Sequence, residues 1–446
     1  MDKKLLYKML AIGLMSILLL IPLSLIEDQI RARSSRQEEV KQNIANSAAG
    51  MQTLSGPVIA LRYHQAVEPE VSKDPETGRL TRSPRYVVKT RYLPPESLSI
   101  DGEAKVESRN RGIYQARLFH LNLAAQGRFI IEPLVSGNTD NSISNIEATL
   151  VLGVSDPRGV DSDPEVTING KRLRFGTPGG QPKNEAELSM PHLSIALGAI
   201  DPSQTSTFNF SLPLQLTGSE RFAIAPSGET NSVHLKSDWR HPNFGGRFLP
   251  RERQVGADGF DARWEISHLA RNFDATLNPN SGEVLSIDFI DPVNVYLQSE
   301  RAVKYGILFI ALTFAGFFLT EILRRSPIHP MQYLLVGLAL AIFFLLLVAL
   351  SEHLRFFLAY AIASAACIAL IGTYLAGALG GARPGMAFAA GLTGLYGVLY
   401  GVLLSEDNAL LMGSVLLFLA LGATMLATRR LNWYQIGNSI APRSGE

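Results

Sequence analysis

The chain has 446 residues, of which 46% are hydrophobic and only 18% charged, so its charge content lies below the roughly 25% usual for soluble proteins. Its 41 Lys and Arg balance 40 Asp and Glu without a basic cluster, which excludes an electrostatic basis for nucleic-acid binding. The single cysteine, Cys367, excludes an intrachain disulfide and lies in an apolar run, where a small core residue is the ordinary interpretation.

Six apolar segments are each long enough to cross a membrane as a helix. About 20 helical residues span a hydrocarbon core about 30 Å thick, and lipid leaves the helix to satisfy its own backbone hydrogen bonds. The predicted spans are residues about 8–26, 303–322, 331–350, 354–374, 385–404 and 409–427. The first is interpreted as an uncleaved anchor, because its apolar run exceeds the roughly 7 to 15 residues of a signal peptide. Residues 26–48 are expected to continue this helix.

Basic residues beside the predicted spans set the expected orientation, because cytoplasmic loops carry an excess of Lys and Arg. With a cytoplasmic N-terminus, the inner flanks hold Lys3, Lys4, Lys8, Arg324, Arg325, Arg383, Arg429 and Arg430. The short outer loops then hold only Arg355. This pattern predicts a multi-pass bacterial inner (cytoplasmic) membrane protein with both termini in the cytoplasm and residues about 27–302 in the periplasm.

Between the first two spans the apolar pattern changes to a period of two, which predicts strands with one buried face. Segments 119–126 and 208–217 alternate apolar and polar residues in this way. Asn169-Gly170 separates two β-favouring runs and predicts a hairpin, because a type I′ turn needs positive φ at both central residues.

The expected fold is a membrane protein of the α + β class. Six transmembrane helices carry a large all-β, sandwich-like and mostly antiparallel periplasmic domain between the first and second helices. The expected parts are 1–50 as anchor and juxtamembrane helix, 51–300 as periplasmic β domain, 301–430 as five-helix transmembrane region and 431–446 as cytoplasmic tail. Two polar segments rich in Pro and Gly, 65–86 and 176–187, are predicted to be mobile loops. The strand order stays open.

The segment SDWRHPNFGGRFLP, residues 237–250, has the ingredients of an active site. Asp238 and His241 could act as an acid/base pair, with Trp239 as a platform. The sequence has no Gly-x-Ser-x-Gly, His-Glu-x-x-His or Cys/His ligand set to accompany them. A packed, turn-rich connection is therefore favoured, with a peptide or partner contact as a further alternative. The positions singled out are Asp238, Trp239, His241, Pro242 and Phe248.

Four ionisable or capping positions lie at the predicted membrane boundaries. His329, which precedes Pro330, could shuttle protons with Glu321, but an interfacial helix start with proline in its first turn is favoured. Glu352 and His353 are adjacent at the opposite boundary, and neighbours in a helix do not share a face. No predicted span carries a charge at its midpoint, which disfavours an ion-coupled transporter.

Several segments, in order along the chain, resemble the CreD family of inner membrane proteins. They are LPPESLSIDG, ESRNRGIYQARLF, SDPRGV, SDWRHPNFGGRFLP, SERAVKYGILFIALTF, HPMQYLLVGLAL with LSEH, SEDNALLMGS and NWY. The resemblance covers nearly the whole chain and implies a Gram-negative protein of cell envelope integrity and colicin tolerance. It also implies expression under a two-component system that responds to growth or cell-wall conditions. The family has no established catalytic residues, so SDWRHPNFGGRFLP and HPMQYLL are family-signature positions.

The leading hypothesis is a non-enzymatic envelope protein without cofactor or metal. It would sit in the lipid bilayer and preserve integrity under stress through contacts of its periplasmic domain with other envelope or membrane proteins. One alternative is a transporter or channel component. The other is an integral membrane enzyme acting on lipid or cell-wall precursors through Glu352, His353, Glu406 and Asp407. The partner, the oligomeric state and the mechanism stay open.

Overall fold

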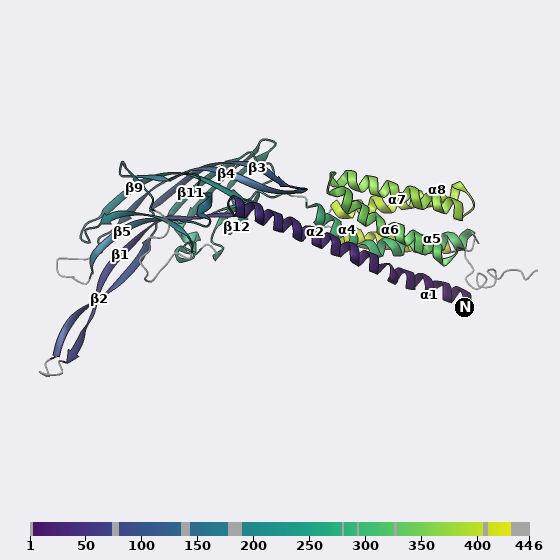
Figure 1. The fold of residues 1–446 in the computed structure, drawn as a ribbon, viewed down its shortest axis with the longest axis horizontal. Coiled ribbons are helices and arrows are strands. Elements are labelled where there is room, and N and C mark those ends of the chain that lie inside the picture. The colour runs from purple at the N-terminus through teal and green to yellow at the C-terminus, as the bar shows by residue number, and fades with distance from the viewer. Residues whose placement is uncertain are drawn as a thin grey trace, which may run out of the picture. The chain divides into compact units, whose positions relative to one another are not determined.

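The computed structural model describes residues 3–73, 80–134, 143–176, 190–278, 281–291, 294–324, 328–404 and 409–429. The chain divides into two compact units (Figure 1). Met1–Glu38 and Val293–Glu446 form the helical unit, and Glu39–Pro292 form the β-sheet unit. The expected boundaries at residues 50 and 300, between the membrane parts and the periplasmic domain, stay predictions.

Two sheets build the β-sheet unit. The first contains, in spatial order, β12 (Asn243–Gly246), β15 (Leu285–Asp288), β10 (Arg221–Ala225), β1 (Gln52–Lys73), β5 (Ile143–Val154) and β8 (His192–Ala199), with β2 (Leu80–Leu93) paired to β1. The second contains β13 (Glu252–Gly256), β14 (Gly259–Ser267), β11 (Thr230–Ser237), β3 (Ser97–Arg111), β4 (Tyr114–Ile131), β9 (Ser206–Ser219), β6 (Glu165–Ile168) and β7 (Lys171–Arg174). The described strand pairs are antiparallel except β1 with β10 and β11 with β3, which are parallel. Short helices in this unit are α3 (Phe273–Thr276) and the 3-10 helices η1 (Pro157–Gly159) and η2 (His268–Ala270).

The two sheets share one hydrophobic core. Leu61 and Leu150 enter it from the first sheet, and Leu121 and Trp264 from the second. In β4 the predicted alternation is confirmed, because residues on one side of the strand are buried and those between them are exposed. Each strand therefore gives its apolar face to the core and its polar face to solvent, as period-two patterning requires.

The hairpin predicted at Asn169-Gly170 is confirmed. These two residues connect β6 and β7, with Ile168 paired to Lys171. Their φ angles are 47° and 81°, so both lie in the left-handed region that a type I′ turn demands. Asn and Gly reach this region more readily than other residues, which explains why the turn forms here.

The loop predicted at residues 65–86 is wrong for its described part. Residues 65–73 belong to β1 and residues 80–86 to β2, and the two strands pair as a long hairpin. Pro69, which lacks an amide donor, lies at a register shift of this ladder, and Pro84 lies on the opposite strand at the same shift. Proline is tolerated there, so the polar, proline-rich composition was misleading. The second predicted loop, 176–187, lies outside the described residues apart from its first position.

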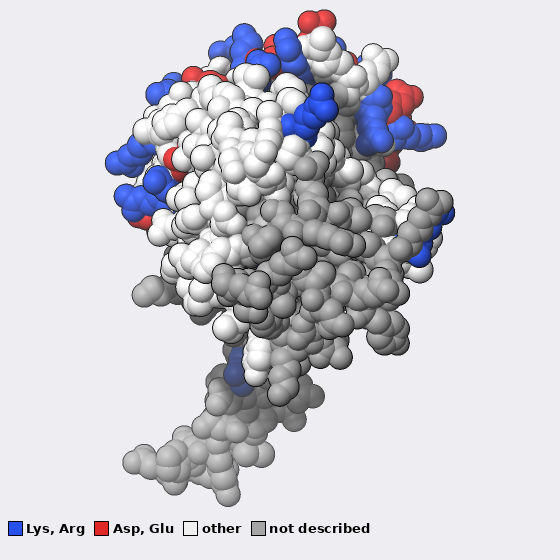
Figure 2. Space-filling view, turned by 90° about the vertical axis from the view of Figure 1, so that its right-hand side faces the viewer, with Lys and Arg blue, Asp and Glu red and all other residues white. Residues whose placement is uncertain are grey.

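The helical unit contains most of the apolar helices. Its elements are α1 (Lys3–Leu18), the first part of α2 (Leu20–Ser47), α4 (Val295–Lys304), α5 (Gly306–Arg324), α6 (Pro330–Ser351), α7 (Phe356–Ala378), α8 (Ala382–Leu404) and α9 (Ala409–Thr428). The expected continuation of the first helix to about residue 48 is confirmed, because α2 ends at Ser47. Most of the described surface that faces the viewer in Figure 2 carries residues other than Lys, Arg, Asp and Glu.

Four described helical stretches are long and apolar enough to cross a membrane. They are Tyr7–Ser47, Pro330–Ser351, Phe356–Ala378 and Ala382–Leu404. The pair α4 and α5 would add a fifth if it forms one span, and Leu411–Leu426 is a shorter apolar helix. The structure thus shows four or five apolar helices of spanning length among the described residues, and the six-span layout stays a prediction.

The span predicted at 303–322 begins at a bend between two helices. α4 ends at Lys304 and α5 begins at Gly306, with an angle of 44° between them. A Cβ atom on Gly306 would lie 3.0 Å from Leu23 Cδ2 and 3.3 Å from Phe344. The glycine therefore permits close packing at the bend, and its low helix propensity favours a break at this position.

Candidate functional site

The segment at residues 237–250, here called the signature segment, connects the two sheets. It leaves the second sheet after β11 and contains β12, which pairs with β15 of the first sheet. Asp238 Oδ1 accepts a hydrogen bond from the backbone N–H of Val106 in β3 at 3.0 Å. The carboxylate therefore fixes the start of the crossing to a neighbouring strand.

Trp239 is held between a cation and a backbone carbonyl. The guanidinium carbon of Arg117 lies 5.1 Å from the ring centroid, within the range of a cation–π contact. Arg117 Nη2 also donates to both carboxylate oxygens of Asp291, at 2.8 and 2.9 Å. The indole Nε1 donates to the carbonyl oxygen of His241 at 2.8 Å. These contacts hold the half-buried indole against the core.

The acid/base interpretation finds no support in these contacts. Within the described part of the chain, no hydrogen bond joins the side chains of Asp238 and His241, and each takes part in a different local contact. Pro242 is half-buried in the turn. Phe248 packs against the core, and its carbonyl oxygen accepts from the indole of Trp264 at 3.1 Å. The signature segment is a structural connection between sheets.

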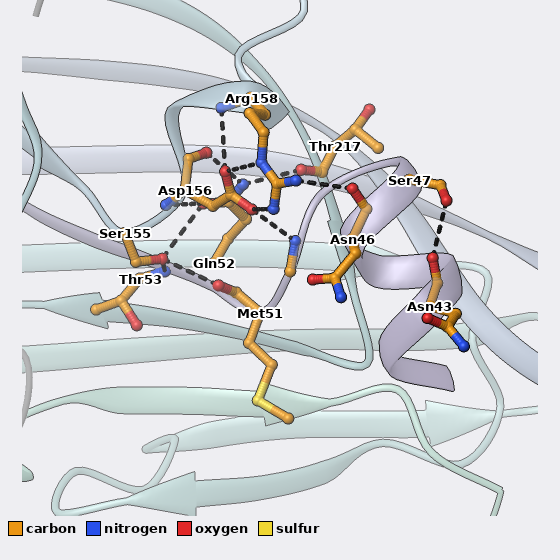
Figure 3. A network of polar contacts seen from close by, with 11 residues as sticks. Asn43, Asn46, Ser47, Met51, Gln52, Thr53, Ser155, Asp156, Arg158 and Thr217 are labelled. Carbon is orange, nitrogen blue, oxygen red and sulfur yellow. Dashed lines mark hydrogen bonds and ion pairs between the residues drawn. The ribbon is translucent and has the colours of Figure 1, made fainter. Parts of the chain in front are cut away.

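A second polar network fastens the end of α2 within the β-sheet unit (Figure 3). Asp156 Oδ2 accepts from the backbone N–H of Gly50 at 2.9 Å and from Arg158 Nη2 at 2.7 Å. Arg158 Nη1 donates to the carbonyl oxygen of Asn46 at 2.7 Å, in the last turn of the helix. Charge-assisted bonds to the final carbonyls of a helix satisfy groups that have no partner within it. We call this network the helix–sheet joint.

The short sequence SDPRGV supplies most of the helix–sheet joint. Pro157 begins the 3-10 helix η1, with Asp156 as its N-cap. A Cβ atom on Gly159 would lie 2.1 Å from Gln52 Nε2 and 2.1 Å from the carbonyl oxygen of Thr217. Gln52 Nε2 donates to that same carbonyl at 3.1 Å, so only glycine leaves room for the bridge. The residues Asp156-Pro157-Arg158-Gly159 alone predict a turn, and the structure adds the bonds that join this turn to α2.

We expect the helix–sheet joint to weaken in acid. The hydrogen bond from Arg158 lowers the pKa of Asp156 to about 2, against the opposing effect of burial. Because the folded pKa lies below the unfolded value of about 3.9, the stabilisation is complete above about pH 5 and is lost progressively as the pH falls through about 2. Asp156→Asn should therefore cost on the order of 2 kcal/mol at neutral pH and little near pH 2.

Thermal unfolding of the detergent-solubilised full chain between pH 2 and 7 measures this difference. Asp163→Asn, at an exposed position nearby, is the matched control and should leave the pH profile unchanged. Parallel profiles for the wild type and Asp156→Asn would contradict the prediction.

Three exposed side chains on the second sheet resemble the nucleophile, base and acid of a catalytic triad. They are Thr217, His120 and Glu107, which lie far apart in the sequence. His120 Nδ1 lies 2.9 Å from Thr217 Oγ1, and His120 Nε2 lies 3.6 Å from Glu107 Oε1. The Thr217 hydroxyl, however, donates to Asp161 Oδ2 at 2.7 Å. The hydroxyl oxygen must then accept a hydrogen bond from the Nδ1–H of His120, so this nitrogen cannot act as a base toward Thr217 in this arrangement. Sequence reasoning missed the cluster because its members lie on separate strands.

Glu321, on α5, is the centre of a buried polar cluster in the helical unit. Its side chain forms an ion pair with Lys8, and only 6% of the surface of Glu321 is exposed. Glu321 Oε1 accepts from the backbone N–H of Ile328 at 3.2 Å, and Oε2 accepts from the hydroxyl of Tyr333 at 2.9 Å. Lys8 Nζ also donates to the carbonyl oxygen of Ile328 at 2.8 Å. The carboxylate is therefore satisfied by three partners, as a buried charge requires.

His329 serves as the N-cap of α6. The ring nitrogen Nδ1 of His329 accepts a hydrogen bond from the backbone N–H of Met331 at 3.2 Å. The backbone N–H of His329 donates to Gln332 Oε1 at 3.1 Å. Pro330 occupies the first helical position, where a missing N–H has no consequence. Glu321, the proton partner considered from sequence, instead contacts the residues named above.

Glu352 and His353 point to different surroundings. Glu352 Oε1 accepts from the hydroxyl of Tyr296 at 3.2 Å and lies 3.6 Å from Arg33 Nε, whereas His353 is exposed. Glu406 and Asp407, the other members of the hypothetical enzyme site, lie outside the described residues. No group of three or more His, Cys, Asp or Glu in the described ranges is arranged to hold a metal ion.

Comparisons with known proteins give one strong similarity. The family model described as "Inner membrane protein CreD" matches residues 4–434. The inner membrane protein CreD of Escherichia coli (strain K12) is 36% identical over 424 residues, which cover 94% of this chain and 91% of that protein.

Solved structures give only weak similarities. An M1 zinc metallopeptidase from Deinococcus radiodurans is 8% identical over 44% of this chain and 42% of its own, at a TM-score of 0.20. A candidate nutrient-binding protein from Legionella pneumophila is 8% identical over 49% of this chain and 77% of its own, at 0.23. Neither similarity carries an argument about fold or function.

Proposed function

Because the chain belongs to the CreD family of inner membrane proteins, we propose that it supports cell envelope integrity under stress through non-catalytic contacts of its β-sheet unit. In this proposal six transmembrane helices anchor the protein, both termini are cytoplasmic, and residues about 27–302 are periplasmic. The distribution of Lys and Arg beside the apolar segments supports this orientation. Tolerance to colicins, which the family resemblance implies, is part of the same proposal.

The observation that carries the proposal is the structural role of residues in the segments that resemble the family. Asp238 binds a strand amide, and Trp239 packs under Arg117. Asp156 and Arg158 join the end of α2 to the sheet. Residues fixed in this way hold a β-sheet surface in place for contacts and are not poised to exchange protons with a substrate.

Transport and catalysis are the two alternatives. Transport needs a polar path, whereas the carboxylate of Glu321 is satisfied by its own partners within the helical unit. Catalysis needs convergent groups, whereas Glu352 contacts Tyr296 and Arg33. Neither alternative gains a specific supporting contact from the described residues.

The test is a chromosomal deletion complemented by variants, with uptake of a large impermeant dye under cell-wall stress as the readout. We expect deletion to raise dye uptake severalfold, and both the wild type and Glu352→Gln to restore it. Photo-crosslinkers on exposed positions of the β-sheet unit should capture envelope proteins in the same cells. Normal uptake after deletion, without crosslinked partners, would overturn the proposal. Loss of complementation by Glu352→Gln at normal protein levels would favour the enzyme alternative.

A further inference from the structure

The hairpin of β1 and β2 extends away from the rest of the β-sheet unit (Figure 1). Its stem, here called the hairpin arm, consists of residues 59–67 of β1 and 85–93 of β2, which pair in one antiparallel register. On its other side β1 pairs with β5 as far as Gln65, opposite Ile143. The hairpin arm is therefore rooted in the first sheet and continues beyond it as two strands.

The outer edge of β2 has no strand beside it in the described part of the chain. In the sheet order β2 pairs with β1 and with no further strand. Residues 86–93 of this edge extend over about 27 Å, which is longer than the commonest strands of about 17–20 Å. An edge of this kind presents unpaired N–H and C=O groups that another chain can pair with.

Three cations occupy one face of this edge strand. Arg85, Lys89 and Arg91 lie at odd-numbered positions, so their side chains share a face, and all three are exposed. None of them forms an ion pair among the described residues, and residues 59–67 and 85–93 contain no Asp or Glu. Some exposed arginines elsewhere in the β-sheet unit have partners, as Arg128 has Glu96 and Arg174 has Glu165.

The opposite face of β2 is mainly apolar and aromatic. It carries Tyr86, Val88, Thr90 and Tyr92 at the even-numbered positions, with Tyr86 53% exposed. Lysine on an edge strand can serve simply to prevent aggregation. That role does not require three cations on one face, without an ion pair among the described residues, and exposed aromatic surface on the other. Both features together favour a binding edge.

We propose that the edge of β2 binds an extended acidic segment of another envelope protein, which adds to the sheet as a further strand. Its acidic side chains face Arg85, Lys89 and Arg91, and its apolar side chains face Tyr86 and Val88. The matching partner segment alternates acidic and apolar residues, because a paired strand places every second side chain on one face. This inference rests on the proposed function and specifies the surface and the chemistry of the partner.

The binding experiment uses the full chain in neutral detergent and a fluorescent ten-residue peptide in which Glu alternates with Val and Thr. Anisotropy should show saturable binding that weakens as salt is raised, because exposed charges are screened. Lys89→Glu combined with Arg91→Glu should lower the affinity at least tenfold. The matched control is Lys171→Glu with Arg172→Glu on β7, an exposed edge strand of four residues, which should bind as the wild type does.

Two further probes identify the mode of binding. The same peptide with N-methyl groups on alternate residues keeps its charge but cannot pair with a strand edge, so its affinity should fall at least tenfold. Equal binding of the methylated peptide, equal loss in both charge-reversal variants, or no binding at all would each overturn the inference. Stronger, Lys89-dependent binding to phosphatidylglycerol vesicles than to the peptide would also overturn it, in favour of a lipid surface.

Complementation of the deletion strain distinguishes this inference from the proposed function on which it rests. If deletion raises dye uptake but Lys89→Glu with Arg91→Glu complements fully, the hairpin-arm inference fails and the proposed function stands. If deletion leaves dye uptake normal, the proposed function fails whatever the peptide result. Complementation by the β7 control but not by the hairpin-arm variant, at equal protein levels, supports both.

Discussion

Replacing Lys8 by Met is expected to destabilise the helical unit by about 3 to 5 kcal/mol. The substitution leaves the carboxylate of Glu321 buried without its cation, with only the amide of Ile328 and the hydroxyl of Tyr333 as partners. Desolvating an uncompensated charge is costly, and two neutral donors do not replace an ammonium group. Unfolding by a denaturing detergent in mixed micelles, followed by circular dichroism of the full chain, measures the loss.

Two controls separate the buried pair from a general effect of lost charge. Lys304→Met removes a cation whose i,i+4 pair with Glu300 is solvent-exposed, with 58% of the Lys304 side chain accessible, so little change is expected. Combining Lys8→Met with Glu321→Gln should recover much of the lost stability, because removing both charges removes the desolvation penalty. Equal effects of Lys8→Met and Lys304→Met would show that the Lys8–Glu321 pair is unimportant for stability.

This pair also shows why sequence reasoning identified the residue but missed its partner. The sequence places His329 at a predicted membrane boundary and offers Glu321, at the end of the preceding span, as its possible proton partner. The structure pairs Glu321 with Lys8, 313 positions away. Periodicity predicts which residues are helical, but the packing of remote helices decides which side chains meet.

The β-sheet unit gives the same lesson. Alternation predicted the buried face of β4, and Asn169-Gly170 predicted a hairpin, because both signals are local properties of the backbone. Asp156 was assigned to a turn, although its carboxylate binds Gly50, 106 positions away. The predicted loop at 65–86 is wrong in its described part because Pro69 and Pro84 were taken to indicate broken structure. Their position at a register shift cannot be read from composition.

Substituting Gly246 by Ala is expected to destabilise the β-sheet unit by about 3 kcal/mol or more. Gly246 has a φ of 81°, which side chains with a Cβ rarely adopt. A Cβ atom there would lie 2.1 Å from the carbonyl oxygen of Val284, and this backbone atom can move only if β12 separates from β15. Strain and lost pairing therefore act together. The unfolding temperature of the full chain, followed by tryptophan fluorescence, measures the effect.

The neighbouring glycine is the matched control and decides what the Gly-Gly pair of the signature segment does. A Cβ atom on Gly245 would lie 3.0 Å from the hydroxyl oxygen of Ser286, which can rotate away, so Gly245→Ala should cost less than about 1 kcal/mol. A large difference between the two variants means that the pair is a structural requirement of the β12–β15 contact. If the Gly246→Ala variant kept its stability but did not lower dye uptake in the deletion strain, Gly246 would be needed for motion of the loop and not for folding. Asp238 and His241 would then again be candidates for chemistry.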